Sequence, residues 1–517
     1  KGRGPCAAPG ECVAGEADGA VLLQHAGRSR GTELSVQHSP EPPDVARHEF
    51  QDVELHGEAP ADAPDPEAAP CDLQKEGGCP IADMPQGQES YVLPGGKTVC
   101  IDTSTPYVFR VIRGDPQKLL FFFQGGGACF DRNTTIIDPT CYTNITAASP
   151  YGVFNWSSPG NPYAGWTSVT VMYCSGDAHA GNISHVYPDD LGKNVTIKQH
   201  GYWNAKSALD WTLANMPSLT SLVISGCSAG SLGTQLWARK VMQSFSDRVS
   251  QSMAAIADSF VAVIPPQIPP GSLFIAYGAC TVPLWTASTL SMCWQGKATP
   301  EMAYADAMVE YPHSAFSNVN SKADVVQIRY YNLFASIYDL PFIDADGMAK
   351  AITMIHGRLS EEHANYVSYL TDGHTHCFLN RPCFETTDTR GEEGQLLPPV
   401  ETCPASGPES HVDCPVSGTD CSGGQCCPRT PGLAATGERT FPCPSAPASF
   451  NGCEYHTKVT DCSTQPTSLT SWVSGFPACH GDSVATACSG TVLKESEFQG
   501  ADFCYAGSAG KVFAAGR

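Results

Sequence analysis

The chain has 517 residues, which is too long for one small domain and suits one large α/β domain with additional segments. Apolar residues make up 42% of the sequence, enough for a sizeable core, so a globally disordered chain is excluded. The 30 basic and 52 acidic residues give a formal net charge of −22, which would repel a nucleic acid, and we expect no such partner.

The first segment, residues 1–84, is rich in Pro, Ala, Gly and acidic residues and shows no helical or strand periodicity. Such a composition buries too little apolar surface to fold by itself. We therefore expect an acidic arm that is largely flexible. Four cysteines could pin parts of it, namely Cys6, Cys12, Cys71 and Cys79.

A compact core is predicted over residues 85–387. Residues 107–112 alternate like a half-exposed strand, whereas residues 118–123 form an unbroken apolar run, typical of a strand buried on both faces. Because strands and helices alternate, we expect a doubly wound, mostly parallel α/β sheet. Further strands are predicted over residues 168–173, 219–225 and 253–257, and helices over residues 201–216, 232–248 and 361–370.

Beyond the core, eight cysteines lie among Pro, Gly and Ser in residues 388–465. This pattern predicts a small insert stapled by disulfides, because the irregular spacings fit a zinc ribbon poorly. Residues 466–517 are expected to return to the core through a short helix over residues 469–476 that carries Trp472.

The cysteine count indicates the cellular compartment. The chain has 24 cysteines and five Asn-x-Ser/Thr acceptors, a combination that favours an oxidising, secretory route with N-glycosylation. Because the sequence begins at Lys1 without an apolar leader, we expect that a signal peptide has been removed or that the chain is a fragment. The acceptors are Asn133, Asn144, Asn155, Asn182 and Asn194.

No membrane span is expected. The richest apolar stretch, residues 260–282, is interrupted by four prolines, and no stretch of about 18 uninterrupted apolar residues exists. We expect a secreted, extracellular monomer.

A catalytic motif lies between a predicted strand and a predicted helix. Gly226-x-Ser228-x-Gly230 is the pattern of a nucleophile elbow, in which a serine occupies a strained turn at the carboxyl end of a strand. The residues two before and two after the serine must be small, so that its hydroxyl is exposed.

A second motif, Gly125-Gly126-Gly127, directly follows the apolar run at residues 118–123. Glycine backbone lets N–H groups approach a developing oxyanion closely, as acyl transfer requires. The alternative is a simple tight turn with no catalytic role. A Walker phosphate loop is excluded, because no Gly-Lys-Ser/Thr follows.

A serine nucleophile needs a base and an acid further along the chain. His374 and His376 follow the predicted helix over residues 361–370, and a mobile imidazole there could reach Ser228. The histidine pair could instead bind a metal, but no carboxylate cluster completes a ligand set. Spacing alone leaves the acid open among Asp324, Asp339, Asp344 and Asp346, with Asp258 as a further candidate that we expect to be structural.

Six motifs occur in a fixed order along the core: GKTVCID at 96–102, FFFQGGGAC at 121–129, WTSVTVMYCSGDAHAG at 166–181, GCSAG at 226–230, ADVVQ at 323–327 and GHTH at 373–376. This series resembles the pectin acetylesterase family of serine esterases. The resemblance covers roughly residues 88–385 and resumes near residues 472–488, leaving the N-terminal arm and the Cys-rich insert outside the family pattern.

The resemblance implies a role for each matched residue. Ser228 would be the nucleophile, Asp324 the orienting acid and His376 the general base. The oxyanion donors would be the backbone N–H groups of Ala229 and of the Gly125/Gly126 turn. The chain departs from the family pattern at three positions, of which the first two would lie beside the acyl pocket: Gln124, Ala128 and Ser231.

The fold implied is α/β-hydrolase-like. The function implied is a secreted serine carboxylesterase that removes O-acetyl groups from a cell-wall-type polysaccharide such as pectin, without a metal or organic cofactor. The charge of −22 favours a neutral acetylated glycan or a highly methylated pectin over a polyanion. Two alternatives are a lipid-ester deacylase, which the family also contains, and an inactive binding protein on a hydrolase scaffold.

Overall fold

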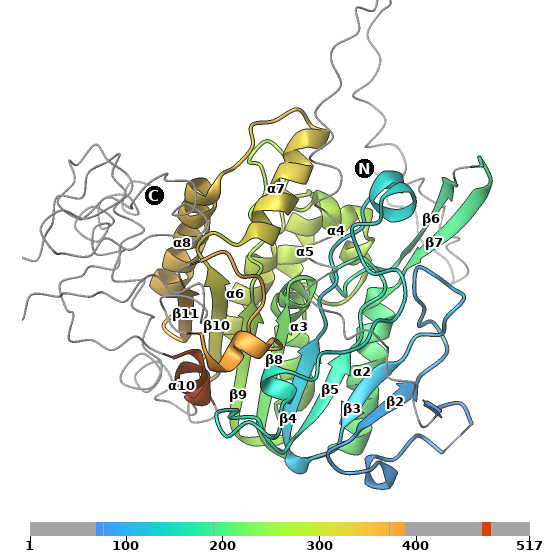
Figure 1. The fold of residues 1–517 in the computed structure, drawn as a ribbon, viewed down its shortest axis with the longest axis vertical. Helices are drawn as coiled ribbons and strands as arrows, with labels where there is room; N and C mark the ends of the chain where they lie inside the picture. Colours follow the sequence, from blue (N-terminus) through green and yellow to red (C-terminus); the bar gives the residue numbers. More distant parts are fainter. Residues whose placement is uncertain (1–68, 76, 190, 372, 388–467, 477–517) are drawn as a thin grey trace, which may run out of the picture. The chain divides into compact units, whose positions relative to one another are not determined.

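The computed structural model describes residues 69–387 and 468–476, apart from residues 76, 190 and 372. Within them, nine strands form one sheet in the order β1-β2-β3-β5-β4-β8-β9-β10-β11 (Figure 1). All neighbouring pairs in this sheet are parallel except β2–β3 and β3–β5. The strands are β1 (Cys71–Asp72), β2 (Glu89–Leu93), β3 (Phe109–Ile112), β4 (Asp115–Phe123), β5 (Trp166–Val171), β8 (Leu219–Cys227), β9 (Val249–Asp258), β10 (Ala315–Ser321) and β11 (Tyr366–Thr371).

Helices and a small hairpin complete the described part. Strands β6 (Ile183–Pro188) and β7 (Asn194–Gln199) pair with each other as a separate antiparallel hairpin. The α-helices are α2 (Gly201–Asn215), α3 (Ala229–Phe245), α4 (Ser272–Ala276), α5 (Ala287–Trp294), α6 (Pro300–Glu310), α7 (Val325–Ile337), α8 (Ala345–Glu362) and α10 (Leu469–Ser474).

The apolar run of β4 explains why the sheet is covered on both faces. Phe121 and Phe123 belong to a cluster that includes side chains of α2, α3 and α6. Phe122 points to the other face and joins a second cluster, which contains Trp472 of α10. Since successive strand residues point to opposite faces, an unbroken apolar run requires two covered faces. The predicted fold class, a doubly wound and mostly parallel α/β-hydrolase sheet, is confirmed.

Most predicted elements match the observed ones, but one is wrong. The segment predicted as a helix over residues 361–370 contains the end of α8 and then β11, which pairs in parallel with β10 from Phe316 to Ser321. Its aromatic and β-branched residues, such as Tyr366 and Val367, suit a strand, and pairing with β10 outweighs any helical tendency of the segment. The segment predicted as a half-exposed strand over residues 107–112 contains β3, which is instead buried throughout, because Phe109 and Val111 lie in one core cluster and Ile112 lies in the cluster on the opposite face.

The predicted segments at the two ends of the core are described only in part. The last residues of the predicted arm belong to the folded core, because β1 extends the sheet and a disulfide joins Cys71 to Cys79. The earlier arm and the Cys-rich insert of residues 388–465 lie outside the described residues. The predicted return helix is present as α10, whose Trp472 is buried.

Five disulfides occur among the described residues; the four besides Cys71–Cys79 are Cys100–Cys174, Cys129–Cys141, Cys227–Cys377 and Cys280–Cys293. Such a density fits an oxidising compartment. None of the helices in the described ranges combines the length and the apolar character that crossing a membrane requires.

Candidate active site

Ser228 lies at the sharp turn between β8 and α3. Its φ of 59° is rare for a residue with a side chain, so the turn is strained. A β-carbon added to Gly226 would lie 2.4 Å from the carbonyl oxygen of Gly230, and one added to Gly230 would lie 1.9 Å from that of Phe123. Both flanking positions therefore require glycine, which accounts for the Gly-x-Ser-x-Gly spacing.

The glycine-rich turn after β4 contacts this elbow. A β-carbon added to Gly125 would lie 2.6 Å from the carbonyl oxygen of Cys227 and 3.0 Å from the β-carbon of Ser228. Gly126 follows with a φ of 148°, which favours glycine. Ala229 begins α3, and backbone N–H groups in a first helical turn have no acceptor within the helix. Two predicted oxyanion residues, Ala229 and Gly125, thus lie at or against the Ser228 turn, and Gly126 is the next residue of the glycine-rich turn.

The predicted base and acid are in contact. Nδ1 of His376 lies 2.8 Å from Oδ2 and 3.0 Å from Oδ1 of Asp324. The Asp324 side chain is fully buried and the imidazole is nearly so. A carboxylate beside Nδ1 holds the proton on that nitrogen, which leaves Nε2 as the basic nitrogen of a neutral ring.

Asp324 is held by more than the imidazole. It is the N-cap of α7, and its Oδ1 accepts hydrogen bonds from the backbone N–H groups of Val326 and Gln327. Its Oδ2 accepts a further bond from the Gln327 side-chain amide at 3.0 Å. The first turn of α7 therefore fixes the orientation of the carboxylate independently of the imidazole.

The other candidate acids have different positions. Asp339 is exposed near the end of α7, and Asp344 caps α8 by accepting from the backbone of Gly347. Asp346 lies in the first turn of α8. The structure therefore brings Asp324 to His376, a choice that spacing alone left open.

Asp258 ends β9 and connects the two halves of the site. Its backbone oxygen accepts from the N–H of Ser228, while its Oδ2 accepts from the N–H groups of Phe378 and Leu379. Burial raises the pKa of this carboxyl group, and a hydrogen bond from Ser259 opposes the shift. Asp258 thus fixes the chain just beyond His376 to the nucleophile turn, which agrees with the structural role expected for it.

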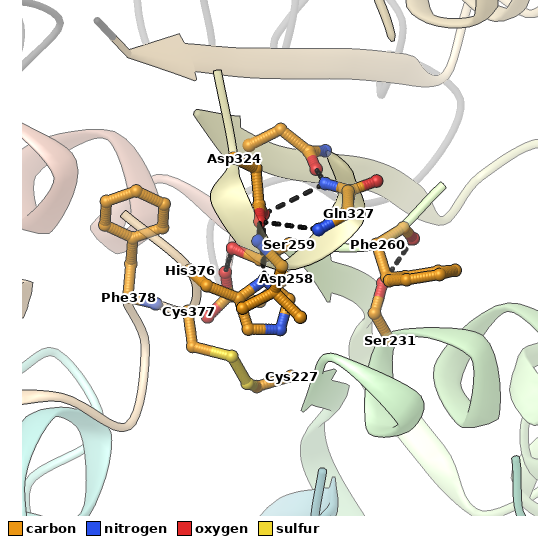
Figure 2. A network of polar contacts seen from close by, with 12 residues as sticks. Cys227, Ser231, Asp258, Ser259, Phe260, Asp324, Gln327, His376, Cys377 and Phe378 are labelled. Atoms are coloured by element: carbon orange, nitrogen blue, oxygen red, sulfur yellow. Dashed lines mark hydrogen bonds and ion pairs between the residues drawn. A yellow bond between two sulfur atoms is a disulfide. The ribbon is translucent and has the colours of Figure 1, made fainter. Parts of the chain in front are cut away.

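A disulfide also joins these segments. Cys227 pairs with Cys377, and Figure 2 shows Asp324, His376 and Asp258 grouped beside this bridge. A ring nitrogen of His376 lies within 4.8 Å of both sulfur atoms, an arrangement whose atom types resemble a metal-ligand set. Both sulfurs are in the disulfide and are not thiolates, so this cluster does not suit a metal ion.

His179 lies in the motif at residues 166–181, and the sequence alone indicated no role for it. Its Nε2 lies 2.8 Å from the carbonyl oxygen of Gln124, the residue before Gly125. Burial lowers the pKa of His179 to about 4, so the ring is neutral at ordinary pH and Nε2–H is the donor. The indole of Trp237 donates to the His179 backbone oxygen. His179 therefore holds the entry to the glycine-rich turn.

Next to it lies Asp177, whose carboxylate accepts from the Ser175 hydroxyl and the Gly201 backbone. Burial raises the pKa of Asp177 to about 7. The carboxylate fills the space where β-carbons on Gly181 and Gly201 would lie, at 2.1 Å in each case.

Of the departures from the family pattern, Gln124 has a structural role through its side chain, whereas the contact of Ala128 is made by its backbone. The side-chain oxygen of Gln124 accepts from the Tyr173 backbone, and its amide nitrogen donates to the Ala147 carbonyl. The N–H of Ala128 donates to the hydroxyl of Tyr330 at 3.1 Å. Both polar atoms of the Gln124 side chain therefore bond to the segments that surround the glycine-rich turn.

The five predicted glycosylation acceptors differ in accessibility. Asn133, Asn144 and Asn194 are exposed, whereas Asn155 and Asn182 are half-buried. The side-chain nitrogen of Asn182, the atom to which a glycan attaches, donates to the Thr281 hydroxyl. The exposed three are the better acceptors.

Comparison with known proteins gives a family and a set of similar structures. Two crystal forms of the Wnt deacylase Notum from Drosophila align at 15% and 16% identity, covering 58% and 57% of this chain and 88% and 86% of theirs, with TM-scores of 0.40 and 0.41. Comparison with curated proteins gives no match. The family model described as Pectinacetylesterase matches residues 93–368, more than half of the chain. The chain therefore belongs to the pectinacetylesterase family of ester-hydrolysing enzymes.

Proposed function

We propose that this chain is a serine carboxylesterase with Ser228 as nucleophile, His376 as general base and Asp324 as orienting acid. The observation that carries the proposal is the His376–Asp324 contact at 2.8 Å, beside a strained serine turn at the same edge of the sheet. Since parallel strands place their carboxyl ends together, β8, β10 and β11 deliver the three residues to one place.

The reaction follows from these positions. With its Nδ1 proton facing Asp324, His376 uses Nε2 to accept the Ser228 proton as the hydroxyl oxygen attacks the ester carbonyl. The oxyanion binds the N–H groups of Ala229 and of the Gly125/Gly126 turn. The imidazolium protonates the leaving alcohol. Water then attacks the acyl-enzyme, with His376 again as base, and releases the acid and free Ser228.

The substrate that we propose is an O-acetyl ester on a cell-wall-type polysaccharide, such as pectin. Membership of the family supports an acetyl ester. The charge of −22 disfavours a strongly anionic chain, although salt screens that repulsion beyond about 8 Å at 0.15 M. A neutral acetylated glycan, or pectin with methylated carboxyl groups, is the substrate class that best fits the charge.

The disulfides support action outside the cell. Five disulfides among the described residues and three exposed glycosylation acceptors are expected of a protein that matures in the secretory route. Expression in a secreting host should therefore yield the glycosylated enzyme with these bridges formed.

The test is acetate release from a panel of acetylated glycans, run with wild type and with Ser228→Ala. We expect wild type to release acetate and the variant to lose about 10⁴-fold or more in rate. Equal release by the two proteins would refute the serine mechanism. A parallel series of p-nitrophenyl acetate and octanoate separates short-acyl from lipid-ester specificity, and faster octanoate turnover would overturn the acetyl assignment.

A further inference from the structure

The Cys227–Cys377 disulfide has a position that the other bridges do not share. Cys227 immediately precedes Ser228, and Cys377 immediately follows His376. The two cysteines are 150 residues apart in the chain, yet their Cα atoms lie 5.6 Å apart. Each of the two residues that must meet in the proposed reaction is therefore one peptide unit away from the same covalent link.

The backbone is strained at Cys377, one end of the bridge, and at Ser228, the residue after the other end. Ser228 has a φ of 59° and Cys377 a φ of 69°, values that side-chain-bearing residues rarely adopt. Such conformations persist only where the surroundings impose them. A covalent link between the two strained segments supplies this constraint, because neither turn can relax without displacing the other.

The segment that carries His376 has little regular structure of its own. After β11 ends at Thr371, residues 373–381 lie in neither helix nor strand, and η5 (Pro382–Glu385) follows. It is held by backbone hydrogen bonds from Ala323 and Val325 to residues 373 and 374, and by the Asp258 carboxylate at residues 378 and 379. The disulfide at Cys377 lies between these two hydrogen-bonded attachments and adds a covalent one.

Burial and proximity complete the arrangement. The exposed fraction is 4% for Cys227 and 1% for Cys377. Both sulfurs lie within 4.8 Å of a ring nitrogen of His376, so the bridge lies close to the imidazole (Figure 2).

We propose that the Cys227–Cys377 disulfide is a positioning element that sets the separation of Ser228 and His376, and that ester hydrolysis therefore depends on its oxidised state. The inference rests on the proposed function and deepens it for the same site. Because a misplacement of about 1 Å can cost about 100-fold in rate, opening the bridge should lower kcat while leaving KM nearly unchanged. KM should change little because substrate contacts outside the Ser228 turn would persist.

The matched comparison uses two double variants. Cys227→Ala with Cys377→Ala removes the bridge, and Cys280→Ala with Cys293→Ala removes another buried bridge that joins η4 (Ala279–Thr281) to α5. For the first we expect kcat for p-nitrophenyl acetate to fall about 10- to 100-fold with KM changed less than about threefold. For the control we expect kcat within about threefold of wild type, even where its thermal unfolding midpoint falls.

A second measurement covers a variant that does not fold. Dithiothreitol gives two electrons and two protons to a disulfide, leaving two thiols and its own cyclic disulfide. Wild type is reduced in steps, each bridge is followed by mass mapping of alkylated peptides, and cooperative unfolding confirms that the sample stays folded. Loss of kcat should follow reduction of the Cys227–Cys377 bridge and return on reoxidation.

The outcomes separate this inference from the proposed function. Active wild type with unchanged kcat in the folded Cys227→Ala/Cys377→Ala variant, or in enzyme reduced at this bridge, would overturn the positioning role alone. Equal kcat losses in the two double variants would also overturn it, since a general loss of stability would then explain both. Absence of turnover by oxidised wild type on every ester would overturn the proposed function and this inference together.

Discussion

The carboxylate of Asp324 lies 2.8 Å from Nδ1 of His376, although 52 residues separate them in the chain. The same carboxylate caps α7 through Val326 and Gln327. One side chain thus fixes both the start of a helix and the tautomer of an imidazole, so the predicted effects of changing it have two parts.

Asp324→Asn should lower kcat by about 10⁴-fold, because an amide can donate to the imidazole and so favour the wrong tautomer. The variant should still fold, since asparagine is also a good N-cap. Steady-state hydrolysis of p-nitrophenyl acetate provides the measurement. Asp339→Asn, at an exposed position, is the matched control and should retain wild-type kcat. Equal losses in the two variants would leave Asp324 without its proposed role.

Gly125→Ala should lower kcat by at least about 100-fold, which is the usual effect of displacing one oxyanion donor. The added methyl group would lie 2.6 Å from the Cys227 carbonyl oxygen and must move the turn away from Ser228. Gly160→Ala is the control, because its nearest non-neighbouring atoms are 3.8 Å away. If both variants retain wild-type kcat, the glycine-rich turn does not take part in the reaction.

Asp177 predicts a pH dependence of stability. Its pKa is about 7 in the folded protein and 3.8 ordinarily, so the folded state binds this proton more tightly. The stabilisation is therefore complete below about pH 4 and is lost as the pH rises to about 7, by an amount on the order of 4 kcal/mol.

Asp177→Asn should remove this dependence, because the amide keeps acceptor and donor groups for Gly201 and Ser175 without titrating. Urea unfolding at pH 4.5 and pH 7.5 gives the free energy of unfolding for wild type and variant. The loss of stability between the two pH values should be smaller in the variant. A variant with the same loss as wild type, or a larger one, would show that Asp177 titrates near its ordinary pKa.

Much of the fold could be predicted from the sequence because its signals are local. The run ending in Phe121, Phe122 and Phe123 is unbroken because both faces of β4 are covered. The glycines around Ser228 are dictated by atoms within the same turn and the adjoining strand. The strand β11 was mispredicted because its conformation depends on pairing with β10, which lies about 50 residues earlier in the chain.

The site could be predicted only in part, because its contacts are distant in the chain. Spacing left the acid open, and only the folded chain brings Asp324 to His376. The partner of Cys227 could not be predicted, since cysteine spacing does not specify disulfide connectivity. The side chains of Asp258 and His179 bond to backbone groups that are distant in the chain, which leaves no local signal.

Covalent labelling of Ser228 tests the central claim most directly. Wild type is treated with a fluorophosphonate, and the modified peptide is identified by mass spectrometry. We predict one adduct per chain, on Ser228, absent from Ser228→Ala and formed at least about 100-fold more slowly in His376→Ala. An adduct on another residue, or labelling of Ser228 at the same rate without His376, would contradict the proposed mechanism.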